Sequence, residues 1–154
     1  MDSKRHGHLL VPLSTRTEQL IVSDLERFIA EARDFVGSHF PRRSDDFTWG
    51  EGSDVIPFFE GVVDDDTAIA QAQAWARTRY DAGFGWISGP QEFGGLELPL
   101  AFDLAYRVVE SEHEVPDTSH LDLGWGMVGP TVLRWAPDEL KEQILRPLYR
   151  GDYV

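Results

Sequence analysis

The chain has 154 residues, 42% of them hydrophobic and 12% aromatic, which is enough apolar material for the core of one folded domain. Asp and Glu number 27 against 14 Lys and Arg, so the formal net charge is −13, and such a surface repels phosphate backbones and anionic lipid. We therefore expect neither a nucleic-acid partner nor a membrane partner. The sequence has no cysteine, which excludes disulfides and thiolate chemistry. The first ten residues lack the long apolar stretch of a signal peptide, and we expect a cytoplasmic protein.

The first predicted helix covers residues 15–39 and follows a terminus, residues 1–14, that we expect to be flexible. Apolar residues recur along this helix at helical spacing, and Thr15 and Glu18 have the spacing of a capping box. Residues 40–66 break the pattern with proline and glycine among scattered aromatic residues. They predict a long ordered loop rather than a flexible tether.

Two further helices are predicted at residues 67–82, which are rich in alanine, and at residues 99–113. The segment between them, residues 83–95, is too rich in glycine for a regular element and too aromatic to be mere surface. The second of these helices should bury one stripe of apolar side chains. These are Ala101, Phe102, Leu104, Ala105, Val108 and Val109.

Residues 118–135 are apolar on most sides but are interrupted by glycine, which predicts a broken or tightly packed helix. A last helix should start at Pro137 and be kinked or ended by Pro147. The sequence shows no internal repeat and no βαβ pattern. The expected fold class is therefore all-α, an irregular bundle of about five helices.

Known site motifs are weak or absent. Gly124, Gly126 and Gly129 loosely match a dinucleotide fingerprint, but that motif needs a preceding strand, and helices are expected on both sides here. His113 and His120, with acidic residues around them, have the residue types of a metal site, but a solvated acidic turn explains them more simply. We assign no catalytic, cofactor-binding or metal-binding residue within the chain.

Three stretches, in this order and spacing, resemble the N-terminal α-helical domain of the acyl-CoA dehydrogenase family. They are GFGWISGPQEFGG at residues 83–95, GWGMVGPTVL at 124–133 and PDELKEQILRPLYRGD at 137–152. The resemblance extends over residues 15–154. It implies a domain that precedes a middle β domain and a C-terminal α domain, and the chain stops about where the β domain would begin.

The resemblance also implies a reaction. In the family, FAD takes a hydride from the β carbon of an acyl-CoA thioester while a glutamate of the C-terminal domain removes the α proton. The β and C-terminal domains hold most of the FAD, so this segment alone should be inactive and free of flavin. The implied partners are acyl-CoA, the missing domains and an electron-transfer flavoprotein, within a homo- or hetero-oligomer.

In the family, the helix that matches residues 121–133 helps to wall the acyl-chain pocket. The resemblance therefore makes four residues candidates for lining that pocket, although ordinary core positions would explain them equally well. The candidates are Leu123, Met127, Val128 and Thr131. Two alternatives stay open: a non-catalytic helical partner subunit or interaction module with the same fold, and a relative of the acyl-CoA oxidases.

Overall fold

The computed structural model describes residues 13–44 and 65–153, and every regular element within these two ranges is helical. In chain order the elements are α1 (Leu13–His39), α2 (Asp65–Asp81), the 3-10 turn η1 (Gln91–Phe93), α3 (Leu100–Ser111), α4 (Ser119–Leu123), the π-helical turn η2 (Gly124–Val128), α5 (Gly129–Trp135) and α6 (Asp138–Arg150). The predicted all-α class is confirmed for the described residues. None of these helices combines the length and the apolar character that a bilayer span requires.

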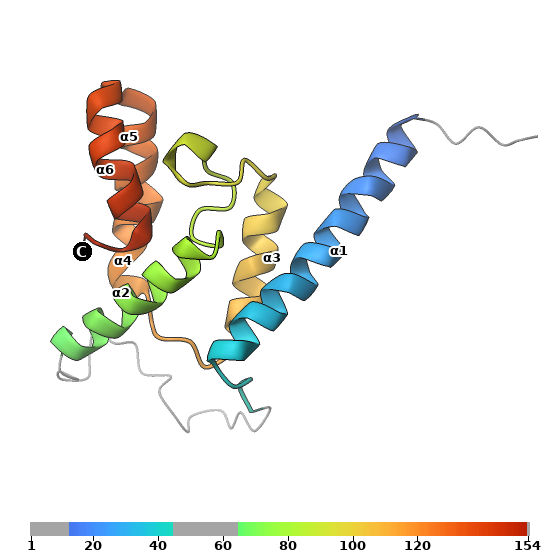
Figure 1. The fold of residues 1–154 in the computed structure, drawn as a ribbon, viewed down its shortest axis with the longest axis horizontal. Coiled ribbons are helices and arrows are strands. Elements are labelled where there is room, and N and C mark those ends of the chain that lie inside the picture. The colour runs from blue at the N-terminus through green and yellow to red at the C-terminus, as the bar shows by residue number, and fades with distance from the viewer. Residues whose placement is uncertain (1–12, 45–64, 154) are drawn as a thin grey trace, which may run out of the picture.

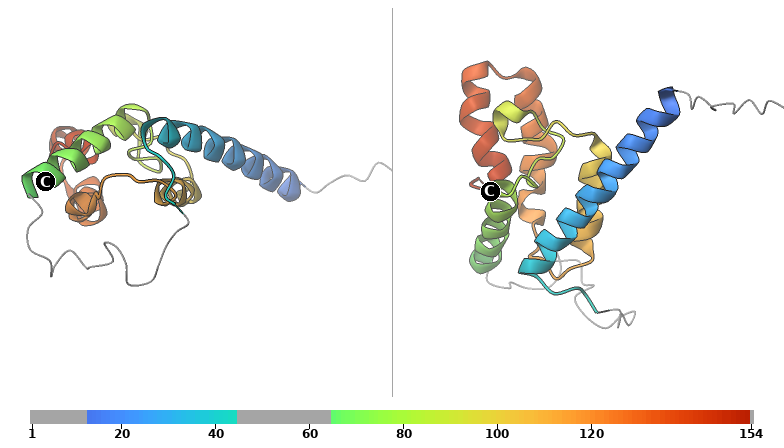
Figure 2. Two further views of the ribbon diagram at one scale, coloured as in Figure 1. Left: turned by 90° about the horizontal axis from the view of Figure 1, so that it is seen from below. Right: turned by 45° about the vertical axis from the view of Figure 1, so that its right-hand side comes forward.

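The helices form two groups that are joined by α2 and the segment after it (Figure 1). In one group α1 packs on α3, and in the other η2 and α5 contact α6, with α4 leading into η2. Helix α2 contacts both α4 and α6. The N-terminal half of α1 projects beyond the other helices in every view (Figures 1 and 2).

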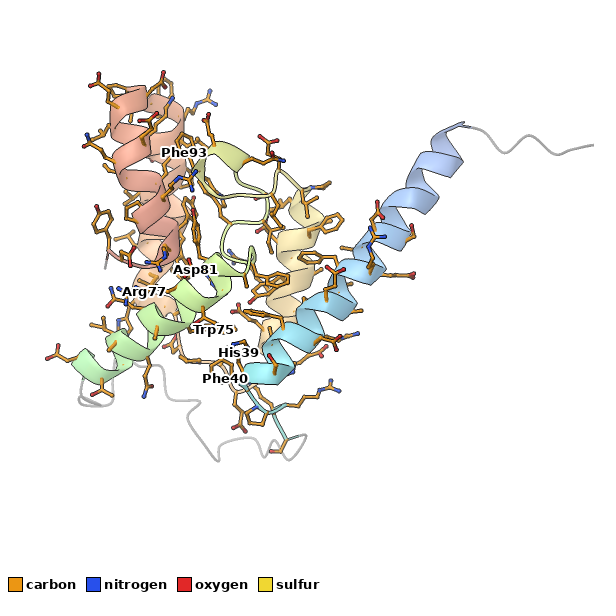
Figure 3. All side chains as sticks on the ribbon, viewed as in Figure 1. His39, Phe40, Trp75, Arg77, Asp81 and Phe93 are labelled. Carbon is orange, nitrogen blue, oxygen red and sulfur yellow. The ribbon has the colours of Figure 1, made fainter. Side chains whose placement is uncertain are left out.

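The core of the first group is built from aromatic rings. Phe28, Ala32 and Val36 follow one another every fourth residue and form the buried stripe of α1. The ring of Phe28 meets the ring of Phe102 on α3 edge to face, with centroids 5.1 Å apart. At the end of α1, Phe40 packs edge to face against Trp75 of α2, beside His39 (Figure 3). Ring packing of this kind fixes where α1 and α3 meet α2.

Helix α1 begins two residues earlier than predicted, so Thr15 lies inside the first turn and not at the N-cap. Of the expected terminus 1–14, residues 1–12 lie outside the described residues. The same holds for most of the expected loop 40–66. Residues 40–44 are described, and there the backbone N–H of Arg43 donates to the carbonyl of Glu112 over 2.9 Å.

Two other sequence predictions are corrected. Leu104 and Val108 of α3 are exposed, whereas Tyr106 is buried together with Phe102 and Val109, so the buried stripe is rotated relative to the prediction. Apolar residues line more than one face of this helix, so hydrophobicity alone does not identify the packed face. Of the two effects expected of Pro147, an end of the helix is excluded, because α6 continues to Arg150 with Gly151 as its left-handed cap at φ 81°.

A buried ion pair joins α2 to α3. Arg79 is only 8% exposed, and its Nη1 lies 3.1 Å from both carboxylate oxygens of Glu110. The indole Nε1 of Trp75 donates to the same carboxylate over 2.7 Å. Burial and the adjacent charge of Glu110 raise the pKa of Tyr106 on α3, so its phenol stays protonated. Charges are costly to bury unless they are paired in this way.

We expect Glu110→Gln to lower the free energy of unfolding by about 3 kcal/mol, because it leaves the guanidinium of Arg79 buried without its counter-ion. The matched control is Glu112→Gln, whose ion pairs are with the exposed residues Arg33 and Arg42. Glu112→Gln should lower the free energy of unfolding by less than about 1 kcal/mol. Urea unfolding followed by circular dichroism measures both. If both variants lose the same free energy of unfolding, the buried ion pair stabilises the fold no more than the exposed pairs do.

A candidate apolar ligand groove

The π-helical turn η2 is held in place through Trp125. Its indole Nε1 donates to the carbonyl of Leu148 on α6 over 2.9 Å, and the guanidinium of Arg79 lies 4.3 Å from the ring centroid. The hydroxyl of Tyr149 donates to the carbonyl of Trp125 over 3.1 Å. Burial, followed by the charge of Asp103, raises the pKa of Tyr149 to about 12, so this donor keeps its proton. Turns of this type interrupt α-helices frequently at functional sites.

Small residues let η2 approach α6 closely. A β-carbon at Gly124 would lie 3.0 Å from Cδ1 of Leu148, and one at Gly129 would lie 2.5 Å from the hydroxyl oxygen of Tyr149. These side-chain contacts agree with the tightly packed helix that the glycines predict here. At Gly126, by contrast, a β-carbon would meet nothing within 4 Å.

A groove with a volume of about 540 Å³ lies between α4 and η2 on one side and α6 on the other. Its lining is mostly apolar. The residues that form it are His120, Leu121, Leu123, Gly124, Val128, Ile144, Leu148 and Tyr153. A volume and composition of this kind suit a small apolar ligand.

The four candidate residues for a pocket wall separate into two pairs. Leu123 and Val128 line the groove. Met127 and Thr131 lie outside its lining, and the hydroxyl of Thr131 turns back to donate to the carbonyl of Met127 over 2.7 Å. Leu123, Met127 and Val128 are 63%, 64% and 42% exposed, so the alternative of ordinary core positions does not hold for these three.

Sequence reasoning did not single out His120, Ile144, Leu148 or Tyr153 as groove residues. Ile144 and Leu148 belong to the apolar stripe of α6, and the periodicity of that stripe could have identified them. His120 and Tyr153 belong to no pattern. Only the packing of η2 and α5 against α6 brings them to the groove.

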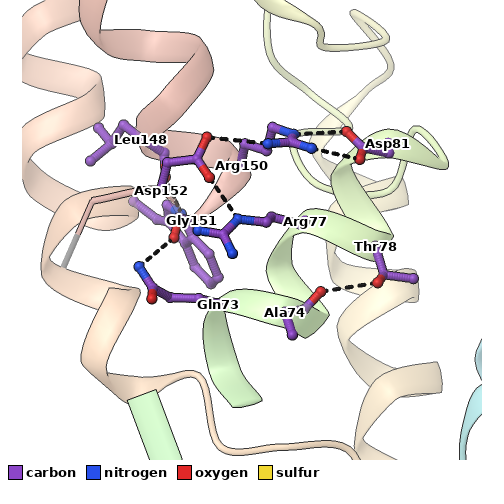
Figure 4. A network of polar contacts seen from close by, with 10 residues as sticks. Gln73, Ala74, Arg77, Thr78, Asp81, Leu148, Arg150, Gly151 and Asp152 are labelled. Atoms are coloured by element: carbon purple, nitrogen blue, oxygen red, sulfur yellow. Dashed lines mark hydrogen bonds and ion pairs between the residues drawn. The ribbon is translucent and has the colours of Figure 1, made fainter. Parts of the chain in front are cut away.

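A network of charged side chains fixes the end of α6 that borders the groove (Figure 4). Arg150 Nε lies 2.9 Å from the carboxylate of Asp81 on α2, and Arg77 Nε lies 2.7 Å from the carboxylate of Asp152. Gln73 of α2 donates to the carbonyl of Gly151 over 2.9 Å. Hydrogen bonds from Arg150 lower the pKa of Asp81, and those from Arg77 and then Arg150 lower the pKa of Asp152.

The segment 83–95 is engaged in internal contacts. Trp86 stacks on Tyr149 of α6 with ring centroids 3.7 Å apart, and Arg146 of α6 donates to the carbonyl of Glu92. Gly94 has a φ of 87°, and the hydroxyl of Tyr80 donates to the carbonyl of the preceding Phe93. These contacts support a structural role for the segment.

The structure does not support the two weaker sequence motifs, the dinucleotide fingerprint and the metal site. Gly124, Gly126 and Gly129 lie within a continuous helical run, without the preceding strand that a dinucleotide fingerprint requires. Across residues 13–44 and 65–153, no three His, Cys, Asp or Glu side chains are grouped so that they could hold a metal ion. His113 is buried, and its Nδ1 hydrogen-bonds the carbonyl of Val109 over 2.8 Å.

The close contact at Gly129 yields a paired prediction. Gly129→Ala should lower the free energy of unfolding by about 2 kcal/mol, because its methyl group would overlap the phenol of Tyr149. Gly126→Ala, in the same turn, should raise it by about 0.5 kcal/mol because alanine restricts the unfolded chain more than glycine does. Thermal or urea unfolding measures both changes. A destabilised Gly126→Ala would contradict the open surroundings of that position.

The charged network predicts how stability depends on pH. The two aspartates have lowered pKa values in the folded state, so their contribution is complete above the unfolded value of about 3.9 and is lost as the pH falls below it. The difference in urea midpoint between the wild type and Arg150→Gln should therefore be constant above about pH 5 and shrink towards pH 2. A difference that grows on acidification would refute this assignment.

Comparison of the sequence with protein-family models and with curated proteins, and of the structure with solved structures, finds no match.

Proposed function

We propose that the chain is the N-terminal helical domain of an FAD-dependent acyl-CoA dehydrogenase, where it helps to wall the acyl pocket and is not catalytic alone. The observation that carries the proposal is the groove beside η2. Two of the four residues that the resemblance selects, Leu123 and Val128, line it. The all-helical fold and the three resembling stretches support the same assignment.

The exposure of the groove wall also supports this proposal. Leu123, Met127 and Val128 present apolar side chains to solvent within six residues of one helical run. Contiguous exposed apolar groups mark surfaces that another molecule or domain covers. A pocket closed by a second domain would remove water from the thioester, and dehydrogenation with a carboxylate base requires such desolvation.

In this proposal the base and the cofactor come from other domains. Two of the half-buried acids are already engaged, since Glu110 pairs with Arg79 and Glu112 pairs with Arg33 and Arg42. The net charge of −13 would not attract the phosphates of coenzyme A, so the cations that bind them should also lie elsewhere. FAD supplies the hydride acceptor in the complete enzyme.

A specific feature favours the alternative of a non-catalytic interaction module. Leu100, Leu104 and Val108 lie at successive i, i+4 positions on α3 and are all exposed, although none of them lines the groove. Such a stripe fits a helix that packs against a partner. A chain that forms a stable complex through this face, without binding acyl compounds, would correspond to this alternative.

The test is a titration of the isotopically labelled chain with octanoyl-pantetheine, an acyl thioester that lacks the phosphates of coenzyme A. Methyl resonances of Leu123, Val128 and Ile144 should shift, and FAD added separately should not be retained after desalting. Leu123→Gln should weaken binding about fivefold, since it removes apolar contact from the groove wall.

Leu140→Gln is the matched control, because Leu140 is an exposed leucine of α6 outside the groove lining. It should leave the affinity unchanged. An absence of shifts at the groove methyls would reject the pocket-wall role. Stoichiometric flavin retention would show that this chain itself holds the cofactor, against the proposal.

A further inference from the structure

The groove differs in chemistry along its length. His120 and Tyr153 are the two polar side chains in its lining, and the other lining residues are apolar or glycine. Ligand pockets commonly combine an apolar wall with a few convergent polar groups that fix the orientation of the ligand. The position of these two side chains therefore bears on which ligand the groove accepts.

Both polar residues lie at the same end of the groove. Leu148 packs over Gly124, and a β-carbon at Gly151 would lie 3.5 Å from Cδ1 of Leu121, so α6 runs antiparallel to α4. His120 directly precedes Leu121, and Tyr153 follows Gly151 by two residues. Val128 and Ile144 therefore mark the opposite, apolar end, about 12 Å away along the helical run.

Neither polar ring is committed to a partner. Within the described ranges 13–44 and 65–153, no hydrogen bond or ion pair engages the imidazole of His120 or the phenol of Tyr153. By contrast, His39 bonds the carbonyl of Phe35 and Tyr149 bonds that of Trp125. Both free rings are exposed and can donate a hydrogen bond to a ligand oxygen.

The charges nearby select against an anion. Asp122 follows His120 by two residues, and the whole chain carries a net charge of −13, whereas Asp152, next to Tyr153, is already paired with Arg77 and Arg150. A carboxylate at this end would face like charges, and these disfavour binding. A neutral oxygen, such as a hydroxyl or a carbonyl, meets two donors without that repulsion.

We infer that the groove binds an acyl group whose apolar part ends in an uncharged hydrogen-bonding oxygen, held between His120 and Tyr153. This rests on the proposed function for the acyl nature of the ligand. The preference for an uncharged oxygen rests on His120 and Tyr153 and does not depend on that function. A purely hydrocarbon terminus would leave both rings without a partner and would bind more weakly.

Three probes of similar length test the inference in the isolated chain: 1-octanol, 1-chlorooctane and octanoate. Binding is read from the methyl resonances of Leu123, Val128 and Ile144. 1-Octanol should bind about threefold to tenfold more tightly than either other probe, which is the effect of one net hydrogen bond. In the double variant His120→Leu/Tyr153→Phe, 1-octanol should lose this advantage over 1-chlorooctane.

The control variant is Glu142→Gln, an exposed change on α6 outside the groove, which should leave the preference intact. Circular dichroism verifies that all variants fold. If the three probes bind equally, if octanoate binds best, or if the double variant keeps its preference, the inference fails while the groove remains a ligand site. If no probe shifts the groove methyls, both the inference and the proposed pocket-wall role fail.

Discussion

The arrangement of the helices depends on how the guanidinium of Arg79 is accommodated in the interior. An arginine that is 8% exposed must have its charge neutralised, and Glu110 on α3 does so while accepting hydrogen bonds from Nη1. The same guanidinium lies over the ring of Trp125, 4.3 Å from its centroid. One side chain of α2 therefore fixes the position of α3 and of the π-helical turn together.

The groove forms because the π-helical turn is held in that position. With Trp125 anchored to the carbonyl of Leu148, the turn is drawn against α6, and Gly124 and Gly129 leave room for the approach. The neighbouring side chains Leu123 and Val128 are then left on the open side, next to Ile144 of α6. Close packing on one face of the turn thus produces an unfilled apolar surface on the other.

Several acidic residues of the protein form ion pairs between separate elements. Glu110, Glu112, Asp81 and Asp152 are occupied in ion pairs that join separate helices. The resulting contacts stabilise the junctions of α2 with α3 and α6. Asp152 is one of these paired acids, although it directly precedes Tyr153 at the groove.

The sequence by itself determined the helical class, the approximate extent of most of the described helices and the close packing of the glycine-containing helix at residues 118–135, because these depend on local periodicity and on glycine and proline. It did not determine which face of α3 is buried, since Leu104 and Val108 fit the apolar pattern as well as Phe102 and Val109 do. Nor did it reveal the pairing of Arg79 with Glu110 or that His120 and Tyr153 line the same groove. The two residues of each pair are about 30 positions apart in the chain. Tertiary packing decides which distant residues lie close together, because it must satisfy burial, charge pairing and close contact at once.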